Sequence, residues 1–79
     1  MELTTSVSID EEHSVARIGL KGALNTDTAP EFEKRLQDVL AEGNSLNVLD
    51  MKELDYISSA GLRVIFKAAK QAKNAGNRL

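Results

Sequence analysis

Two stretches of alternating hydrophobic and polar positions open the chain. Residues 3–9 alternate between two faces, with Leu3, Val7 and Ile9 on one of them. Residues 14–20 alternate again, with Ile18 and Leu20 on one face, and the polar stretch 10–13 separates the two segments. A period of two residues is typical of a strand with one buried face. The beginning of the chain therefore predicts two antiparallel strands joined by a hairpin loop.

A turn-rich stretch, residues 21–27, then leads into a predicted amphipathic helix. Thr28 and Glu31 have the spacing of a capping box, and Pro30 stands in the first turn, where its missing N–H loses no hydrogen bond. Gly43 is placed to end this helix in a left-handed conformation. The apolar stripe between these signals consists of Phe32, Leu36, Val39 and Leu40.

The second half predicts a strand and another helix. Residues 45–51 are mostly apolar, which is typical of a strand buried on both faces. A helix is expected over residues 59–74, ending near Gly76, with Lys67, Lys70 and Lys73 on its outer side. The residues expected to face inward are Leu62, Ile65, Phe66 and Ala69. The order β-β-α-β-α indicates an α/β (α+β) fold with helices packed on a mixed sheet.

Residues 77–79 have the character of one more strand. Such a strand would complete a right-handed βαβ unit with residues 45–51, and without it one sheet edge stays open to pairing. We therefore expect one domain over residues 1–79, truncated at its C-terminus. A homodimer or another partner is expected to cover the open edge.

Composition narrows the classes of function. A chain of 79 residues with no cysteine and one histidine offers neither a disulfide nor a metal site, and no cofactor is expected. Its net charge of −2, with basic residues scattered among the acids, argues against direct binding of nucleic acid. No apolar run is long enough for membrane insertion and no secretory signal is evident, so a cytoplasmic protein is expected.

The sequence also argues against an enzyme. A serine nucleophile needs a base within hydrogen-bond reach, and His13, the one histidine, falls in the predicted hairpin loop. The run 58–61, Ser-Ser-Ala-Gly, lacks the glycine that precedes the serine of a nucleophile elbow. No Gly-Lys-Ser/Thr follows Gly19 or Gly22 to make a phosphate-binding loop.

The run 55–62, Asp-Tyr-Ile-Ser-Ser-Ala-Gly-Leu, carries the clearest functional signal. It leads into the start of the second helix, where free N–H groups and the helix dipole favour an anion. One interpretation is purely structural, with Ser58 as a helix N-cap. The other is that Ser59 is phosphorylated, because a helix start tolerates a phosphate of about −1.5 to −2 charges while the surface changes. The residues alone leave both interpretations open.

The same run resembles the phosphorylation loop of the STAS family, which includes bacterial anti-sigma factor antagonists and domains of sulfate transporters. The matching residues are 55–63, supported by Leu20-x-Gly22-x-Leu24, the helix opening near Ala29 and the strand Leu46–Asp50. The resemblance implies a STAS fold that continues with one more strand and helix. It also implies that a partner serine kinase, which is the anti-sigma factor, phosphorylates Ser59. The unphosphorylated domain would bind that kinase and free a sigma factor for transcription, and phosphorylation would end the binding.

The resemblance further places a partner-binding surface around Ser59. Its expected members are Asn25, Thr26, Ser58, Gly61, Leu62 and Arg63. Ser58 stands where antagonists often have an aspartate, and Asn25 stands where an aspartate often follows Gly-x-Leu. These departures leave open a hypothesis of another class: a STAS interaction module that is not phosphorylated and acts as a scaffold or as an accessory subunit of a transport system.

Overall fold

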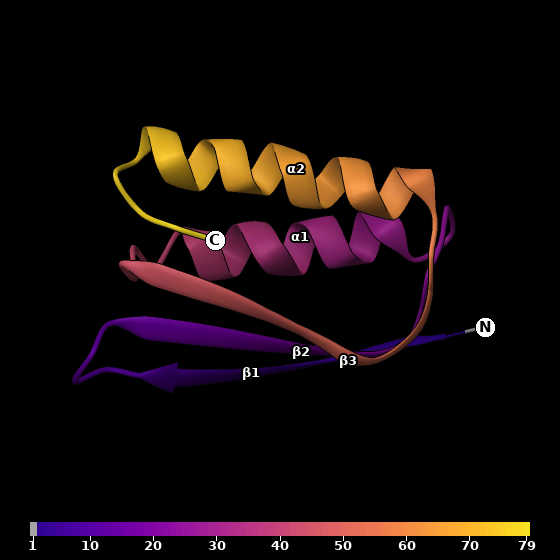
Figure 1. Ribbon diagram of the computed structural model, residues 1–79, viewed down its shortest axis with the longest axis horizontal. Helices are drawn as coiled ribbons and strands as arrows, with labels where there is room; N and C mark the ends of the chain where they lie inside the picture. Colours follow the sequence, from indigo (N-terminus) through magenta and orange to yellow (C-terminus); the bar gives the residue numbers. More distant parts are fainter. Residues whose placement is uncertain (1) are drawn as a thin grey trace.

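Three strands and two helices form two layers in the computed structural model, which describes residues 2–79 (Figure 1). The sheet order is β1-β2-β3, with β1 antiparallel and β3 parallel to β2. Both helices cover the same face of this sheet (Figure 1). The elements are β1 (Leu3–Asp10), β2 (Val15–Leu24), α1 (Ala29–Leu40), β3 (Leu46–Ile57) and α2 (Ser59–Asn74). The predicted mixed sheet of order β-β-α-β-α is confirmed.

The hairpin of β1 and β2 follows from its alternating pattern. Ala16, Ile18 and Leu20 of β2 are buried under the helices, whereas Arg17, between Ala16 and Ile18, is exposed. His13 lies in the connecting turn, as predicted, and its Nδ1 is 2.8 Å from Oδ2 of Asp10. The side chain of His13 is exposed at this turn, which joins β1 to β2.

The strand β2 extends four residues into the stretch that was expected to be a turn, so the prediction for residues 21–24 is wrong. Gly22 makes the extension possible, because its φ of +106° is a conformation that residues with a side chain rarely adopt. A Cβ at this position would also collide with the backbone carbonyl of Glu2. The extension carries two buried residues, Ala23 and Leu24, to the base of α2.

The apolar stripe of α1 makes the centre of the core, as predicted. Phe32, Leu36 and Val39 are buried and Leu40 is half-buried. Pro30 lies in the first turn of the helix, and Gly43 has the left-handed φ of +76° expected of it.

The strand β3 differs from its prediction in length and in burial. It spans Leu46–Ile57 instead of residues 45–51, and Leu46 and Met51 are exposed, Met51 by 43%. The prediction of a strand buried on both faces is wrong, because β3 is an edge strand and the helices cover one face alone.

The helix α2 has the predicted bounds, but the prediction of its buried face is wrong for two residues. Leu62 is 40% exposed and Phe66 is 67% exposed, while Ile65 and Ala69 are half-buried. The side chains that α2 does bury are small, which allows it to lie close along α1 (Figure 1). The buried residues of α2 are Gly61, Ala68 and Ala72.

Residues 77–79 return to the sheet beside the beginning of β3. Arg78 forms an isolated parallel bridge with Leu46: its N–H donates to the carbonyl of Ser45 at 3.0 Å, and its carbonyl accepts from the N–H of Asn47 at 2.8 Å. The side chain of Asn47, only 1% exposed, donates to the same carbonyl from Nδ2 at 2.9 Å. Its Oδ1 has no partner among residues 2–79. The predicted start of a strand is therefore present as one parallel bridge.

A matched pair of leucine truncations tests this assignment of the core. Leu36→Ala should lower the free energy of unfolding by about 2–5 kcal/mol, because Leu36 is fully buried. Leu62→Ala should lower it by less than about 1 kcal/mol, because Leu62 is substantially exposed. Urea denaturation followed by circular dichroism measures both, and equal losses would restore the inward-facing assignment of Leu62.

Candidate functional site at the start of the second helix

The start of α2 is organised by Ser58, which is the helix N-cap as predicted. Its backbone is extended, with φ −92° and ψ 169°, and its hydroxyl accepts a hydrogen bond from the N–H of Gly61 at 3.2 Å. Its carbonyl accepts from the N–H of Leu62 at 3.0 Å. The hydroxyl and carbonyl of Ser58 are thus both engaged in holding the first turn of the helix.

Ser59 occupies the first helical position with a different environment. Its side chain is exposed, and its hydroxyl makes no hydrogen bond with any residue in the 2–79 range. Arg63, also exposed, lies four residues further on and hence on the same face of α2, one turn away. Of the two adjacent serines, Ser58 caps the helix and Ser59 faces the solvent.

Gly61 fastens this helix start to the end of β2. A Cβ on Gly61 would lie 2.6 Å from Cγ of Leu24, so a larger residue would force the helix away from the sheet. Beside this contact the N–H of Ser58 donates to the carbonyl of Leu24 at 2.8 Å. The predicted site residues Ser58 and Gly61 are brought together here, and their contacts are structural.

A second loop, between β2 and α1, is closed by Asn25. Its Oδ1 accepts from the N–H groups of Asp27 at 2.9 Å and Thr28 at 3.0 Å. The hydroxyl of Thr28 accepts from the N–H of Asn25 and donates to the carbonyl of Ala23, both at 2.9 Å. Asn25 therefore uses its side-chain carbonyl inside the loop, as an Asx turn does.

This network overturns the predicted capping box of Thr28 and Glu31. Thr28 has nearly helical angles, φ −95° and ψ −16°, and makes no side-chain cap. Its hydroxyl is already occupied on the loop side, because Asn25 stands three residues earlier. The spacing Asn-x-x-Thr was the signal in the sequence that could have indicated this arrangement.

A groove of about 300 Å³ separates the first turns of α1 and α2. It brings together two of the predicted binding residues, Thr26 from the loop and Arg63 from α2. Glu33 and Lys67 also line it, with Nζ of Lys67 3.5 Å from Oε2 of Glu33. Sequence reasoning missed this second pair, since its position depends on how the helices pack. The predicted residue Leu62 does not line this groove.

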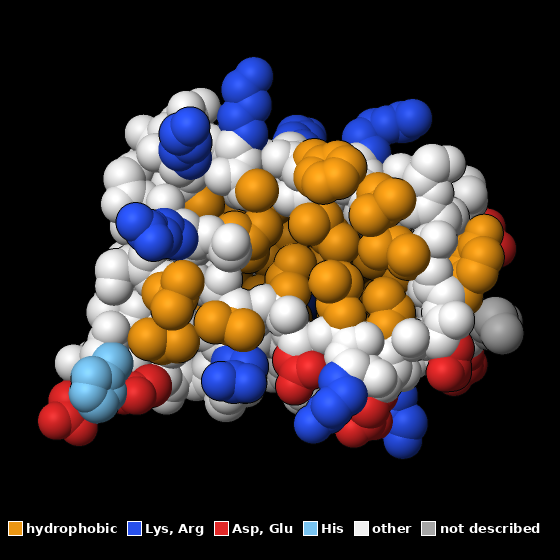
Figure 2. Space-filling view, viewed as in Figure 1, with side chains coloured by type: hydrophobic (Ala, Val, Ile, Leu, Met, Phe, Trp, Pro, Cys, Tyr) orange, Lys and Arg blue, Asp and Glu red, His pale blue; other side chains and the backbone are white. Residues whose placement is uncertain are grey.

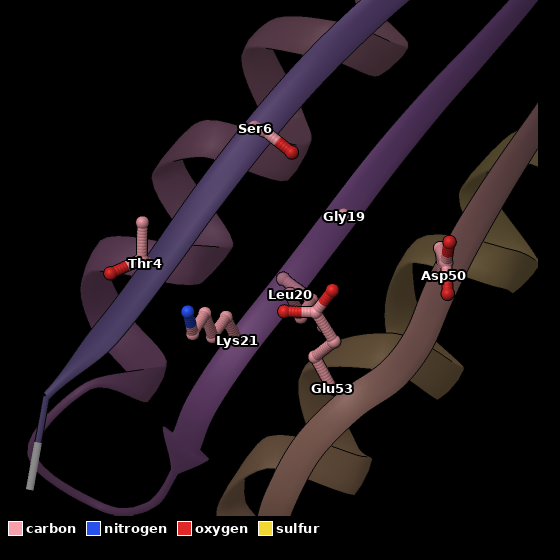
Figure 3. Close-up of a pocket in the computed structure, with 7 residues that line it drawn as sticks. All are labelled: Thr4, Ser6, Gly19, Leu20, Lys21, Asp50 and Glu53. Atoms are coloured by element: carbon pink, nitrogen blue, oxygen red, sulfur yellow. The ribbon is translucent and has the colours of Figure 1, made fainter.

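The uncovered face of the sheet carries a separate hollow of about 210 Å³ (Figure 3). Thr4 and Ser6 of β1, Lys21 of β2, and Asp50 and Glu53 of β3 border it, and both helices lie behind the sheet in this view. None of the predicted site residues lines it. Over residues 2–79 no group of three potential metal-ligating side chains is found.

Comparison with known protein families identifies the family of this chain. A family model described as "Mlab, STAS domain" matches residues 7–79, so the chain belongs to the STAS domain family. The expected resemblance is thereby confirmed for the fold. Within the described part of the chain, no helix is both long and apolar enough to cross a membrane.

One relative and two solved structures extend this comparison. The chain is 42% identical over 60 residues to a Bordetella bronchiseptica protein described as an anti-sigma factor antagonist, BtrV. The match covers 76% of this chain and 52% of that protein, so the chain spans about half the relative's length.

The crystal structure of an anti-sigma factor antagonist from Mycobacterium paratuberculosis superposes with a TM-score of 0.82 at 23% identity, covering 89% of this chain and 58% of that chain. The crystal structure of Mglu gives a TM-score of 0.73 at 24% identity, covering 90% of this chain and 18% of that one. At these identities, the two structures show a shared fold.

The two serines should differ sharply in their contribution to stability. Ser58→Ala should lower the free energy of unfolding by about 0.5–2 kcal/mol, because the N–H of Gly61 loses its cap. Ser59→Ala should change it by no more than about 0.5 kcal/mol, as expected for an exposed position. Chemical denaturation of both variants checks this difference, and a larger loss for Ser59→Ala would reverse the assignment of the cap.

Proposed function

We propose that this chain acts as an anti-sigma factor antagonist that is switched by phosphorylation of Ser59. In its unphosphorylated state it binds an anti-sigma factor that is also a serine kinase, and this binding frees a sigma factor for transcription. Phosphorylation by the same partner ends the binding. The 42% identity to the Bordetella bronchiseptica protein supports this proposal, as does membership of the STAS family.

The observation that carries the proposal is the contrast between Ser58 and Ser59. A kinase needs a hydroxyl that reaches solvent and is not engaged in the fold. Ser59 meets this condition, whereas the hydroxyl of half-buried Ser58 accepts the hydrogen bond that caps α2. Between these adjacent serines, the geometry favours Ser59 as the acceptor.

Electrostatics at this position favours a phosphate on the folded domain. The first turn of a helix offers free N–H groups and the positive end of the dipole. The guanidinium of Arg63, one turn along, is placed to pair with a phosphate on Ser59, with the anion on the N-terminal side as helix pairs prefer. We therefore expect the modification to leave the fold intact and to change its surface.

The groove between the helix starts suits a docking partner. It joins apolar surface from Pro30 and Val64 to the polar side chains of Thr26 and Arg63. A dianion at Ser59 would have to be desolvated by a partner that covers this region, which is costly when the partner offers no matching cation. This cost is the physical basis of the switch.

Phosphorylation of the chain by its cognate kinase tests the site directly. After incubation with kinase and ATP, mass spectrometry should find one phosphate, on Ser59. Ser59→Ala should remove the signal, and Ser58→Ala, which keeps the acceptor, should retain it. Phosphate on Ser58 or elsewhere, or none on the parent, would contradict the proposal.

Binding of the same kinase tests the switch. Ser59→Asp should weaken the affinity by at least about tenfold, because it introduces a charge at the interface. Ser59→Asn introduces a side chain of nearly the same size as Asp but without its charge. It should keep the affinity within about threefold, a change in binding free energy smaller than the ~1 kcal/mol of one lost contact. Isothermal titration calorimetry measures both variants, and equal affinities for the two would remove the mechanism.

A second function is favoured by the chemistry of two positions. Ser58 and Asn25 bring no charge, and their side-chain oxygens already accept internal hydrogen bonds. This would suit a STAS module that docks without a phosphorylation cycle, as a scaffold or as an accessory subunit of a transport system. Neighbouring genes for transporter subunits would favour this function, and genes for a kinase and a sigma factor would favour the first.

A further inference from the structure

Arg63 stands between Ser59 and the groove that separates the first turns of α1 and α2. Successive residues of an α-helix are about 100° apart, so Arg63 lies about 40° around the axis from Ser59, and Val64 about 140°. Arg63 and Val64 line the groove, whereas Ser59 does not. A phosphate on Ser59 would therefore lie beside the groove, with Arg63 between the phosphate and the groove.

The charges that line the groove leave Arg63 as its available cation. Lys67 also lines it, and its Nζ is 3.5 Å from Oε2 of Glu33. Arg63 is exposed and forms no ion pair with any residue between positions 2 and 79. The groove thus offers a positive charge that the described part of the fold does not neutralise, next to the apolar surface of Pro30 and Val64.

The outer side of α2 has the same sign of charge. Residues 59–74 include basic side chains, all of them exposed, and no acidic one. Figure 2 shows Lys and Arg side chains along the upper border, where Figure 1 shows α2, and Asp and Glu side chains toward the sheet below. A surface of this charge favours a partner that is acidic where it docks. The basic residues of α2 are Arg63, Lys67, Lys70 and Lys73.

We propose, taking the proposed function as given, that the anti-sigma factor docks a carboxylate side chain against Arg63 and that a phosphate on Ser59 ends this contact by pairing with the same guanidinium. A guanidinium binds carboxylate and phosphate through the same fork of N–H groups. The phosphate is tethered one turn away, so it has the advantage of an intramolecular contact. With about −1.5 to −2 charges on the phosphate, the resulting pair turns a net negative charge toward an acidic partner. This effect adds to the desolvation of the phosphate and, unlike desolvation, requires Arg63.

The pair within the chain is measured first, without a partner. The chain is prepared by chemical synthesis with phosphoserine at position 59, so this measurement does not depend on a kinase. A titration followed by ³¹P NMR should give a second pKa of the phosphate that is about 0.3 unit higher in Arg63→Gln than in the parent, because the guanidinium favours the dianion. Lys70→Gln removes the same charge from the same face of α2, roughly 16 Å from Ser59 along the axis, and should leave this pKa unchanged.

Competition for Arg63 is then measured with a double-mutant cycle. Isothermal titration calorimetry without ATP, so that no phosphate is transferred, gives the affinity of the kinase for the phosphorylated and unphosphorylated forms. Phosphorylation of the parent should weaken binding at least about tenfold, and so should Arg63→Gln alone, because each removes a charged contact. In Arg63→Gln the further loss on phosphorylation should be at least about threefold smaller than in the parent, since the contact that it ends is already absent. Lys70→Gln should show the same loss on phosphorylation as the parent.

Desolvation of the phosphate alone predicts the opposite result. The loss on phosphorylation would then be equal or larger in Arg63→Gln, because no cation remains beside the phosphate, and this outcome would overturn the proposal. A phosphate pKa that does not change in Arg63→Gln would overturn it as well, provided that circular dichroism shows each variant to be folded. Failure of the proposed function is recognised separately, because the unmodified parent would then show no affinity for the kinase, which removes the docking contact before Arg63 is changed.

Discussion

The arrangement of this molecule depends on one junction, where the end of β2 meets the start of α2. Leu24 is fully buried, its carbonyl accepts the N–H of Ser58, and its side chain fills the space that a Cβ on Gly61 would need. Because β2 is the middle strand, this junction ties the second helix to the centre of the sheet. The exposure of Ser59 and the direction of α2 both follow from it.

The loop before α1 is built onto the same strand end. The carbonyl of Ala23, next to Leu24, accepts a hydrogen bond from the hydroxyl of Thr28. The side-chain oxygen of Asn25 accepts from the N–H of Thr28 and closes the turn between Ala23 and Thr28. The two helix starts are therefore fixed from adjacent residues of one strand. The groove that holds Thr26 and Arg63 is a consequence of this common origin, since each helix brings one of its walls.

The sequence predicted what is decided by near neighbours. The alternation of β1 and β2, the stripe of α1 and the bounds of α2 are local patterns, and the N-cap at Ser58 is a local preference. The exposure of β3 and Phe66 was not predictable in this way, because an apolar side chain is buried only where another element reaches it. The predicted capping box is absent for a related reason. The hydroxyl of Thr28 accepts from the N–H of Asn25, a residue outside the pattern that predicted the box. The pairing of Glu33 with Lys67 depends on how the two helices pack, and the sequence carries no clear signal of it.

The sheet order also gives the domain an uneven resistance to local opening. Among residues 2–79, β2 is the one strand with hydrogen-bonded neighbours on both sides, whereas β3 has an open edge. Amide hydrogen exchange should consequently be slowest in β2 and faster toward the edge of β3 and the residues beyond α2. Ser59 lies one residue from the hydrogen bond between the N–H of Ser58 and the carbonyl of Leu24, which attaches α2 to this slowly exchanging strand. A kinase of the proposed switch would therefore meet a helix start whose backbone opens less readily than the outer edge of β3.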